Sequence, residues 1–109
     1  MWKTRVAAPH EARTGESIEV RTLIAHPMES GFRLDSIGKP IPRDIIVGFS
    51  CDYLGTRVFE AEFFPAISAN PYLSFYVTAL RTGTMTLTWT DQHGNSASAQ
   101  HYLTVLDSQ

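Results

Sequence analysis

The sequence predicts an all-β domain, an antiparallel β-sandwich of about seven strands. Two observations carry this prediction. Apolar and polar residues alternate with a period of two along several short stretches, which gives each stretch one apolar and one polar face. Turn residues, mainly Gly, Pro and Asn, separate these stretches at short intervals, and no stretch has the period of an amphipathic helix.

Length and composition limit the possible classes of protein. The chain has 109 residues, which fits a single domain over residues 1–109. A domain of this size buries roughly two thirds of its unfolded surface, so it can fold without disulfides, and Cys51 is the only cysteine. The net charge of −2 argues against a protein that binds nucleic acid or a membrane surface, because either would carry a basic patch. No apolar run is long enough to span a bilayer.

Interruptions of the alternating pattern place the strands in order. Pro9 ends the first strand and Pro27 the second, because proline cannot donate a ladder hydrogen bond. Residues 54–56 form a short hairpin turn between the third and fourth strands. Turns at residues 81–83 and 91–95 separate the last three strands. The expected strands are residues 2–8, 18–25, 45–53, 58–63, 72–79, 84–90 and 97–105.

The strand number and the apolar faces favour an immunoglobulin-like sandwich, with a small barrel as the alternative. The paired cysteines of antibody domains are absent, so apolar side chains must hold the two sheets together. Each large one contributes about 1.5–3 kcal/mol when it is buried. Those expected between the sheets include Phe75, Val77, Leu87 and Trp89. The third strand is expected to face the core with Ile45, Val47, Phe49, Cys51 and Tyr53.

The loop from His26 to Arg43 is the most informative stretch. It has no sustained period of either kind, and connections this long in a small domain are usually functional or disordered. It contains too many apolar groups for a solvated linker, so we expect a folded loop that presents a surface to a partner. These groups are Met28, Phe32, Leu34, Ile37 and Ile41.

Four stretches in this order resemble one family. They are Thr-Leu-Ile-Ala-His-Pro-Met-Glu-Ser-Gly at 22–31, Gly-Lys-Pro-Ile-Pro-Arg at 38–43, Ala-Asn-Pro-Tyr-Leu-Ser-Phe at 69–75 and Thr-Trp-Thr-Asp at 88–91. The combination resembles SoxZ, the small subunit of the SoxYZ sulfur carrier of bacterial thiosulfate oxidation, over about residues 6–105. Phe32 departs from the pattern, since a polar residue is expected there.

The resemblance implies a non-catalytic subunit with no cofactor and no metal. SoxZ-like chains pair with SoxY, whose C-terminal cysteine arm holds the sulfur substrate. They also help to dock the carrier transiently to the Sox cytochrome, hydrolase and dehydrogenase components. The N-terminal residues lack the features of a signal peptide, so the protein stays in the cytoplasm, has had its signal trimmed or is exported with another protein. The resemblance implies the last of these, a periplasmic location reached by export together with SoxY.

We expect the partner interface to use the loop and aromatic groups on neighbouring edges, because interfaces favour aromatic residues, Met and Arg. Arg33, Lys39 and Arg43 are also expected to steer an anionic sulfur species or an acidic partner, although solvated arginines are the more common case. The candidate interface residues are His26, Met28, Phe32, Arg33, Arg43, Phe59, Phe63 and Phe64.

Two alternatives from other classes remain open at this point. A small periplasmic copper-binding sandwich would use His26 and Met28, because imidazole and thioether suit that metal. The structural interpretation of the same two residues is that His26 satisfies loop backbone groups and Met28 packs inward. A sulfur-transfer enzyme would use Cys51, although its position in the strand predicts a buried and inert thiol. Glu60 and Glu62 are expected on a solvated face rather than in a catalytic pair.

The Asn70-Pro71-Tyr72 stretch is expected to fix the start of the following strand. Tyrosines at the corners of such sandwiches bond back to loop backbone, and we expect this of Tyr72. Trp89 and Asp91 are expected to be core and turn residues respectively.

Overall fold

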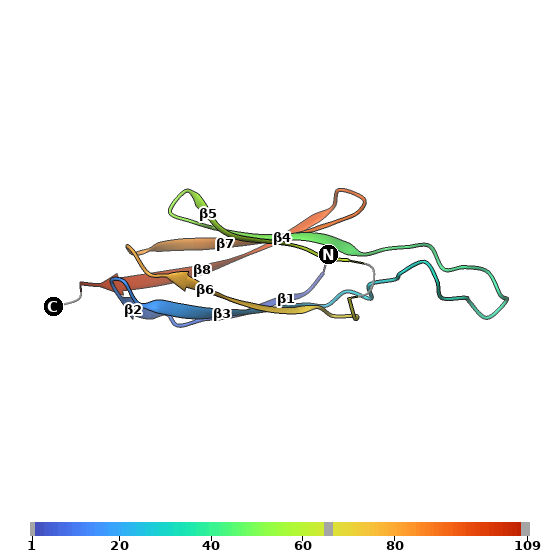
Figure 1. Ribbon diagram of the computed structural model, residues 1–109, viewed down its shortest axis with the longest axis horizontal. Coiled ribbons are helices and arrows are strands. Elements are labelled where there is room, and N and C mark those ends of the chain that lie inside the picture. Colours follow the sequence, from blue (N-terminus) through green and yellow to red (C-terminus); the bar gives the residue numbers. More distant parts are fainter. Residues whose placement is uncertain (1, 65–66, 108–109) are drawn as a thin grey trace.

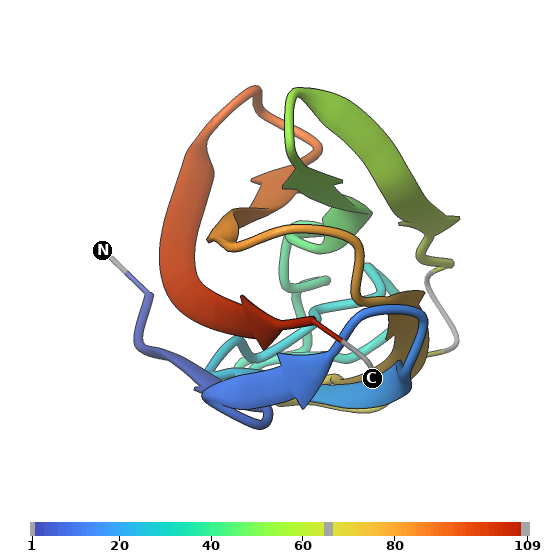
Figure 2. The same ribbon diagram turned by 90° about the vertical axis from the view of Figure 1, so that its left-hand side faces the viewer.

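The computed structural model describes residues 2–64 and 67–107. A three-stranded sheet in the order β1-β3-β6 and a five-stranded sheet in the order β2-β8-β7-β4-β5 form two layers (Figures 1 and 2). This confirms the predicted all-β, immunoglobulin-like sandwich, and no helix in the described part of the chain is able to cross a membrane. The strands are β1 (Thr4–Ala7), β2 (Glu11–Arg13), β3 (Ser17–Ile24), β4 (Ile46–Tyr53), β5 (Thr56–Glu62), β6 (Tyr72–Thr78), β7 (Gly83–Asp91) and β8 (Ser96–Leu106).

The strands agree with the sequence prediction except for β2. β1 and β3 to β8 match the expected strands, and the predicted β4–β5 hairpin is present, with Tyr53 paired to Thr56. β2 has only three residues and runs parallel to β8, with Glu11 paired to Thr104. A strand this short shows no periodicity, so its existence depends on the edge of β8 that it pairs with.

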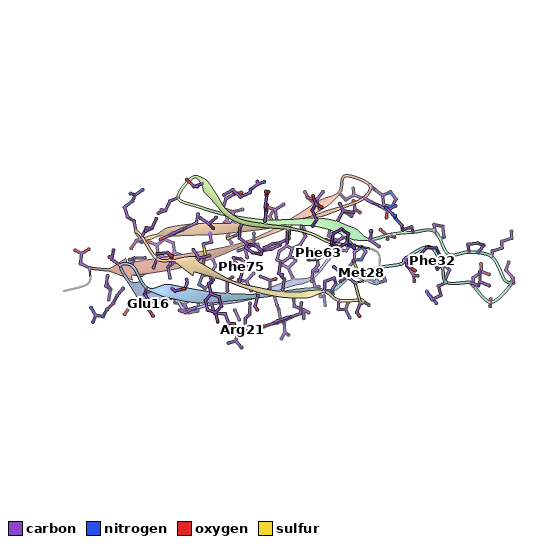
Figure 3. The ribbon with its side chains drawn as sticks, in the orientation of Figure 1. Glu16, Arg21, Met28, Phe32, Phe63 and Phe75 are labelled. Carbon is purple, nitrogen blue, oxygen red and sulfur yellow. The ribbon has the colours of Figure 1, made fainter. Side chains whose placement is uncertain are left out.

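The core between the sheets is an aromatic cluster. Phe75 of the three-stranded sheet stacks on Phe59 with ring centroids 4.4 Å apart and lies 5.6 Å from Phe49, both of the five-stranded sheet (Figure 3). Phe49 in turn packs on Trp89 at 5.1 Å. Aromatic pairs of this kind contribute about 0.5–1.5 kcal/mol beyond the burial of their area. Val77 also lies in this core, so the side chains predicted to join the sheets do so.

The start of β4 departs from the predicted alternation. Phe49 and Tyr53 face the core as expected, but Ile46 is fully buried whereas Val47 is only half-buried. The pairing of β4 with β7 shifts register between Ile46 and Gly48. Such a bulge inserts one residue into a strand and reverses which side chain faces inward. Ile46 therefore takes a core position that the alternation did not assign to it, while Val47 packs against the core only in part.

The tyrosine that bonds back to loop backbone is Tyr53, not Tyr72. The hydroxyl of Tyr53 donates to the Arg81 carbonyl and accepts from the backbone N–H groups of Leu80 and Arg81 at 3.3 and 3.1 Å. Tyr72 is 61% exposed on the outer face of its sheet. Its predicted role is therefore corrected, because its neighbour Asn70 makes the contact that fixes this corner.

A long projection extends from one end of the sandwich, drawn in cyan to green (Figure 1). The molecule measures 65 × 20 × 19 Å, and its radius of gyration is 16.6 Å. A compact domain of about 100 residues has a radius of gyration near 13 Å. The projection accounts for this difference, and residues 29–44 within it are called the arm below.

Candidate functional site

The arm is a narrow ribbon of two antiparallel segments. Glu29 and Asp44 exchange two backbone hydrogen bonds of 2.8 Å at its base, and Leu34 pairs with Pro40 near its tip. Pro40 and Pro42 lack the backbone N–H that a continuous ladder needs, which confines the pairing to isolated bridges. The predicted folded loop is thus present, as a ribbon rather than as an irregular coil.

The tip of the arm is closed by the side chain of Asp35. Its Oδ1 accepts hydrogen bonds from the backbone N–H groups of Ile37 at 3.0 Å and Lys39 at 2.9 Å. The backbone N–H of Asp35 also donates to the Lys39 carbonyl at 2.8 Å. Gly38 adopts a positive φ of 83°, which glycine accepts without strain. The turn is therefore organised before any partner is met.

Three large apolar side chains of the arm face solvent, whereas Ile41 is half-buried. Phe32 is 87% exposed, Ile37 73% and Leu34 58% (Phe32 is labelled in Figure 3). Single exposed apolar residues are common on protein surfaces, but three large ones on one narrow ribbon form a cluster. A clustered apolar surface on a projecting element is typical of a protein-binding site.

The charges near the base of the arm largely neutralise one another. The Arg33 guanidinium bonds to both carboxylate oxygens of Glu29, four residues earlier. This hydrogen bond and the attraction of the charges lower the pKa of Glu29, and the same contact raises the pKa of Arg33. The positive charge of Arg33 is therefore paired within the arm. This geometry does not test the predicted steering role of Arg33, which stays a hypothesis.

Arg43 holds the second segment of the arm against the sandwich. Its Nε donates to the Gln92 side-chain oxygen at 3.1 Å, and the same oxygen accepts from the Ile45 backbone N–H at 3.3 Å. Gly31 lies opposite, and a Cβ built on it would stand 3.2 Å from the Arg43 Cβ. The two segments can approach this closely because position 31 has no side chain.

The base of the arm is a corner between β3 and β6 that hydrogen bonds hold in place. The His26 backbone N–H donates to Asn70 Oδ1 at 2.9 Å, and the Asn70 N–H donates to the His26 carbonyl at 2.7 Å. The imidazole of His26 is buried, and its Nδ1 accepts from the Met28 N–H at 2.9 Å. Met28 has a positive φ of 52°, and its sulfur accepts from the Ile46 N–H at 3.2 Å. His26 satisfies loop backbone and Met28 packs inward, as the structural interpretation of these residues predicted.

This hydrogen bonding leaves the copper-binding alternative without support. Because Nδ1 of His26 accepts a hydrogen bond, the ring proton of the neutral imidazole lies on Nε2, which therefore has no lone pair for a metal. Nε2 lies 3.7 Å from Asp44 Oδ1, as does Nε2 of His93. Over residues 2–64 and 67–107, no group of three His, Cys, Asp or Glu side chains is arranged to hold a metal ion.

The other candidate interface residues divide between core and surface. Phe63 is buried and Phe59 half-buried against the core, whereas Phe64 is 62% exposed. His26 and Met28 are also buried, so they can support the arm but offer no surface to a partner. Phe63 is likewise covered in this chain, and the part of these three residues in a partner interface stays untested. Whether the exposed members contact a partner stays a prediction.

Cys51 is a structural residue. Its side chain is fully buried in β4. Burial, and to a lesser extent the charge of Asp52, raises the pKa of its thiol to about 11. A reactive cysteine needs exposure and a lowered pKa, so the buried, inert thiol predicted from the strand pattern is confirmed and the sulfur-transfer alternative has no support.

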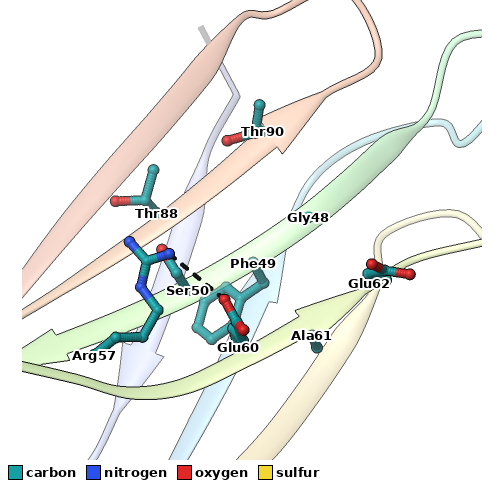
Figure 4. A pocket seen from close by; sticks show the side chains of 9 residues that line it. All are labelled: Gly48, Phe49, Ser50, Arg57, Glu60, Ala61, Glu62, Thr88 and Thr90. Carbon is teal, nitrogen blue, oxygen red and sulfur yellow. Dashed lines mark ion pairs between the residues drawn. The ribbon is translucent and has the colours of Figure 1, made fainter.

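The expected solvated face of β5 is also present. Glu60 and Glu62 are exposed and border a shallow groove of about 490 Å³ over the outer side of the five-stranded sheet (Figure 4). Arg57 bonds to Asp52 at 3.1 Å and lies 3.5 Å from Glu60. This is an ordinary surface ion-pair network, because none of these carboxylates is buried as a catalytic pair would require.

Two residues that shape the arm were missed in the sequence. Asp35 stands three residues before Gly38, a spacing typical of a tight turn, and this signal was sufficient to predict the tip. Gln92 carries no such signal, because its contact with Arg43 joins positions 49 residues apart in the chain. Only the folded structure brings them together.

These features define a class of protein: an immunoglobulin-like domain whose projecting element, rather than a pocket, is its candidate functional site. The chain belongs to the SoxZ family, described as sulphur oxidation protein SoxZ, whose family model matches residues 5–101. It therefore takes part in sulphur oxidation. Comparison with curated proteins finds no significant match.

Solved structures share the fold at low sequence identity. A superoxide reductase (neelaredoxin) from Ignicoccus hospitalis has a TM-score of 0.71 at 14% identity, covering 94% of this chain and 79% of its own. The sulfur carrier protein SoxY from Chlorobium limicola f. thiosulfatophilum has a TM-score of 0.66 at 15% identity, covering 94% and 78%. A putative superoxide reductase from Thermotoga maritima has a TM-score of 0.73 at 14% identity, covering 94% and 85%. At these identities the likeness concerns the fold alone.

Proposed function

We propose that this chain is the non-catalytic SoxZ subunit of a heterodimeric SoxYZ sulfur carrier, in which it pairs with SoxY. The observation that carries the proposal is the arm of a SoxZ-family chain, a preorganised ribbon with Phe32, Leu34 and Ile37 exposed. Exposed apolar groups on a rigid support bind a partner at low entropic cost, because little is left to order on binding. The inert Cys51 and the absence of a buried carboxylate pair in the described residues support a role without catalysis.

In this role the arm is the main contact with SoxY, and the exposed Phe64 adds to the contact surface. The assembled carrier meets the Sox cytochrome, hydrolase and dehydrogenase components transiently. We also propose that the pair acts in the periplasm after joint export. Cell fractionation with and without an exported SoxY would test this location, and a chain that reaches the periplasm without SoxY would contradict joint export.

Native mass spectrometry of this chain with purified SoxY tests the pairing. A one-to-one complex without bound metal is expected. Phe32→Ala should weaken the affinity about tenfold or more, because truncating an aromatic anchor commonly costs more than about 1.4 kcal/mol. Thr84→Ala, an exposed position on the five-stranded sheet, is the matched control and should bind normally. A chain that stays monomeric beside SoxY would refute the proposal, and normal binding of Phe32→Ala would remove the arm from it.

A further inference from the structure

The two outer faces of the sandwich differ sharply in composition. The outer face of the three-stranded sheet carries basic and aromatic side chains, and we call it the basic face: Lys3, Arg5, Arg21, Leu23, Tyr72 and Tyr76. The outer face of the five-stranded sheet carries mainly hydroxyl groups over β4, β7 and β8, with the Asp52, Arg57, Glu60 and Glu62 charges along its β5 side. We call it the hydroxyl face after its members Ser50, Thr84, Thr86, Thr88, Thr90 and Ser98. Tyr102 is the one large aromatic residue described on that second face.

Strand register places the members of the basic face next to one another. Arg5 lies opposite Leu23, which lies opposite Tyr72, so the three form a row across the sheet. In the next outward row Arg21 stands between Ala7 and Ser74. Directly opposed side chains on a sheet are about 4.5–5.5 Å apart at Cβ, so these rows form one continuous surface.

The small side chains of the second row leave a depression in the basic face. It has a volume of about 350 Å³, and Arg5, Ala7, Arg21, Leu23 and Tyr72 line it. Tyr72 is 61% exposed, and Arg21 points away from the sandwich (Figure 3). Tyrosine and arginine dominate the energetically important positions of interfaces, whereas serine and threonine are under-represented there. The basic face therefore has the composition of a docking surface, and the hydroxyl face does not.

Charge identifies the kind of surface that fits. On this face Glu19 is the one acidic residue described, beside three basic residues, Lys3, Arg5 and Arg21. The local charge of the face is therefore +2 (three positive less one negative), whereas the net charge of the chain is −2. The Arg21–Glu19 contact is long, at 3.7 Å, and its partners are 59% and 41% exposed. Such an exposed pair contributes little energy, so the guanidinium donors stay available. The complementary surface is acidic.

The basic face also continues into the arm. Leu23 and Tyr72 lie at the end of the three-stranded sheet where β3 ends at Ile24 and the chain leaves toward the arm (Figure 1). We propose that the subunit held by the arm also rests on the basic face, with an acidic patch over Arg5 and Arg21 and a side chain in the depression beside Tyr72. This inference rests on the proposed function and names the face that the partner covers.

Binding kinetics of the chain with purified SoxY test this placement. Tyr72→Ala should weaken the affinity about tenfold or more, as expected for a hot-spot aromatic residue. Arg21→Glu should lower the association rate several-fold at low salt and much less at high salt, because salt screens the attraction. Tyr102→Ala and Thr88→Glu are the matched controls on the hydroxyl face and should bind as the unmodified chain does. All four positions lie on outer faces, so unchanged thermal unfolding will confirm that each variant folds.

The outcomes separate the two proposals. If the unmodified chain binds SoxY but Tyr72→Ala and Arg21→Glu also bind normally, SoxY does not rest on the basic face. The proposed pairing with SoxY would still stand. A loss confined to Tyr102→Ala or Thr88→Glu would overturn the inference in favour of the hydroxyl face. If the unmodified chain does not bind SoxY at all, the proposed function fails and this inference fails with it.

Discussion

The arm and the sandwich contain similar side chains in opposite environments. Phe75 is 5% exposed between the sheets, whereas Phe32 is 87% exposed on the arm. The sandwich is held by aromatic packing, and the arm by a few backbone bonds and the Asp35 turn. The free energy of burying Phe75 is realised on folding, whereas that of burying Phe32 becomes available only when another surface covers it. One region therefore accounts for stability, and the other is the proposed binding site.

The largest expected effect lies in the core. Trp89→Ala should lower the free energy of unfolding by about 3–5 kcal/mol, because it leaves a large cavity beside Phe49. Urea denaturation followed by circular dichroism measures this. A loss below about 1 kcal/mol would show that the two sheets are held by other contacts, and the contrast with the arm would disappear.

The next largest change in the free energy of unfolding is expected at the corner between His26 and Asn70, which joins the arm to the sandwich. Asn70→Ala removes the side-chain oxygen that accepts from the His26 N–H and places alanine at a φ of 53°, which asparagine tolerates better. A loss of about 1–3 kcal/mol is expected from the unpaired N–H and the strained backbone. Asn70→Gly relieves only the strain and is the matched control. It should recover part of the loss in the same denaturation experiment, and no recovery would exclude strain as a cause.

Asp91 should give a pH-dependent effect of intermediate size. Burial alone would raise the pKa of Asp91, but hydrogen bonds from the backbone and side chain of Asn95 and from the His93 N–H hold it below its usual value. A depressed pKa means that the folded state favours the ionised form. The resulting stability is present above the ordinary aspartate pKa of about 3.9 and is lost as the pH falls through the folded-state pKa.

Asp91→Ala should therefore destabilise the protein at pH 7 by about 0.5–1.5 kcal/mol. Its difference from the unmodified chain should shrink as the solution is acidified below pH 4. Unfolding free energies measured from pH 2 to pH 7 check this expectation. A difference that grows on acidification would mean that the folded state favours the protonated carboxyl, contrary to the sign derived above.

The smallest effect on stability is expected at the arm. Phe32→Ala should change the free energy of unfolding by less than about 0.5 kcal/mol, because its side chain is 87% exposed and leaves no cavity. Denaturation under the conditions used for Trp89→Ala gives the direct comparison. A loss as large as that of Asn70→Ala would show that the arm packs on the sandwich in solution, against its projecting position here.

Much of the fold was predictable because a period of two depends on neighbouring residues only. The alternation along β3, β6 and β7 states which side chains face inward, and Phe75, Val77, Leu87 and Trp89 do so. The prediction failed at Ile46, which is fully buried beside the half-buried Val47 where a bulge shifts the register of β4. The position of the bulge depends on how β4 pairs with β7, and the local sequence pattern does not reveal that pairing.

The candidate site was predictable in place but not in detail. Pro27 and the lack of period after it located the loop, and its apolar content indicated a surface for a partner. The same sequence offered both an inward and an interface role for Met28 and did not choose between them, whereas the structure turns Met28 inward and Phe32 outward. That division depends on the turn at Met28, whose positive φ and sulfur contact with Ile46 form only when β4 lies beside it.

By itself, then, the sequence determined the fold class, the order of the strands, the inert Cys51 and the resemblance to SoxZ, because each depends on residues close together in the chain or on motifs read in order. The tertiary structure alone decided that the loop projects as an arm and that Tyr53 rather than Tyr72 bonds back to loop backbone. It also decided that Arg5, Arg21 and Tyr72 share one face. The physical reason is that strand pairing joins residues as far apart in the chain as Glu11 and Thr104. This pairing sets which side chains are covered and which remain for a partner.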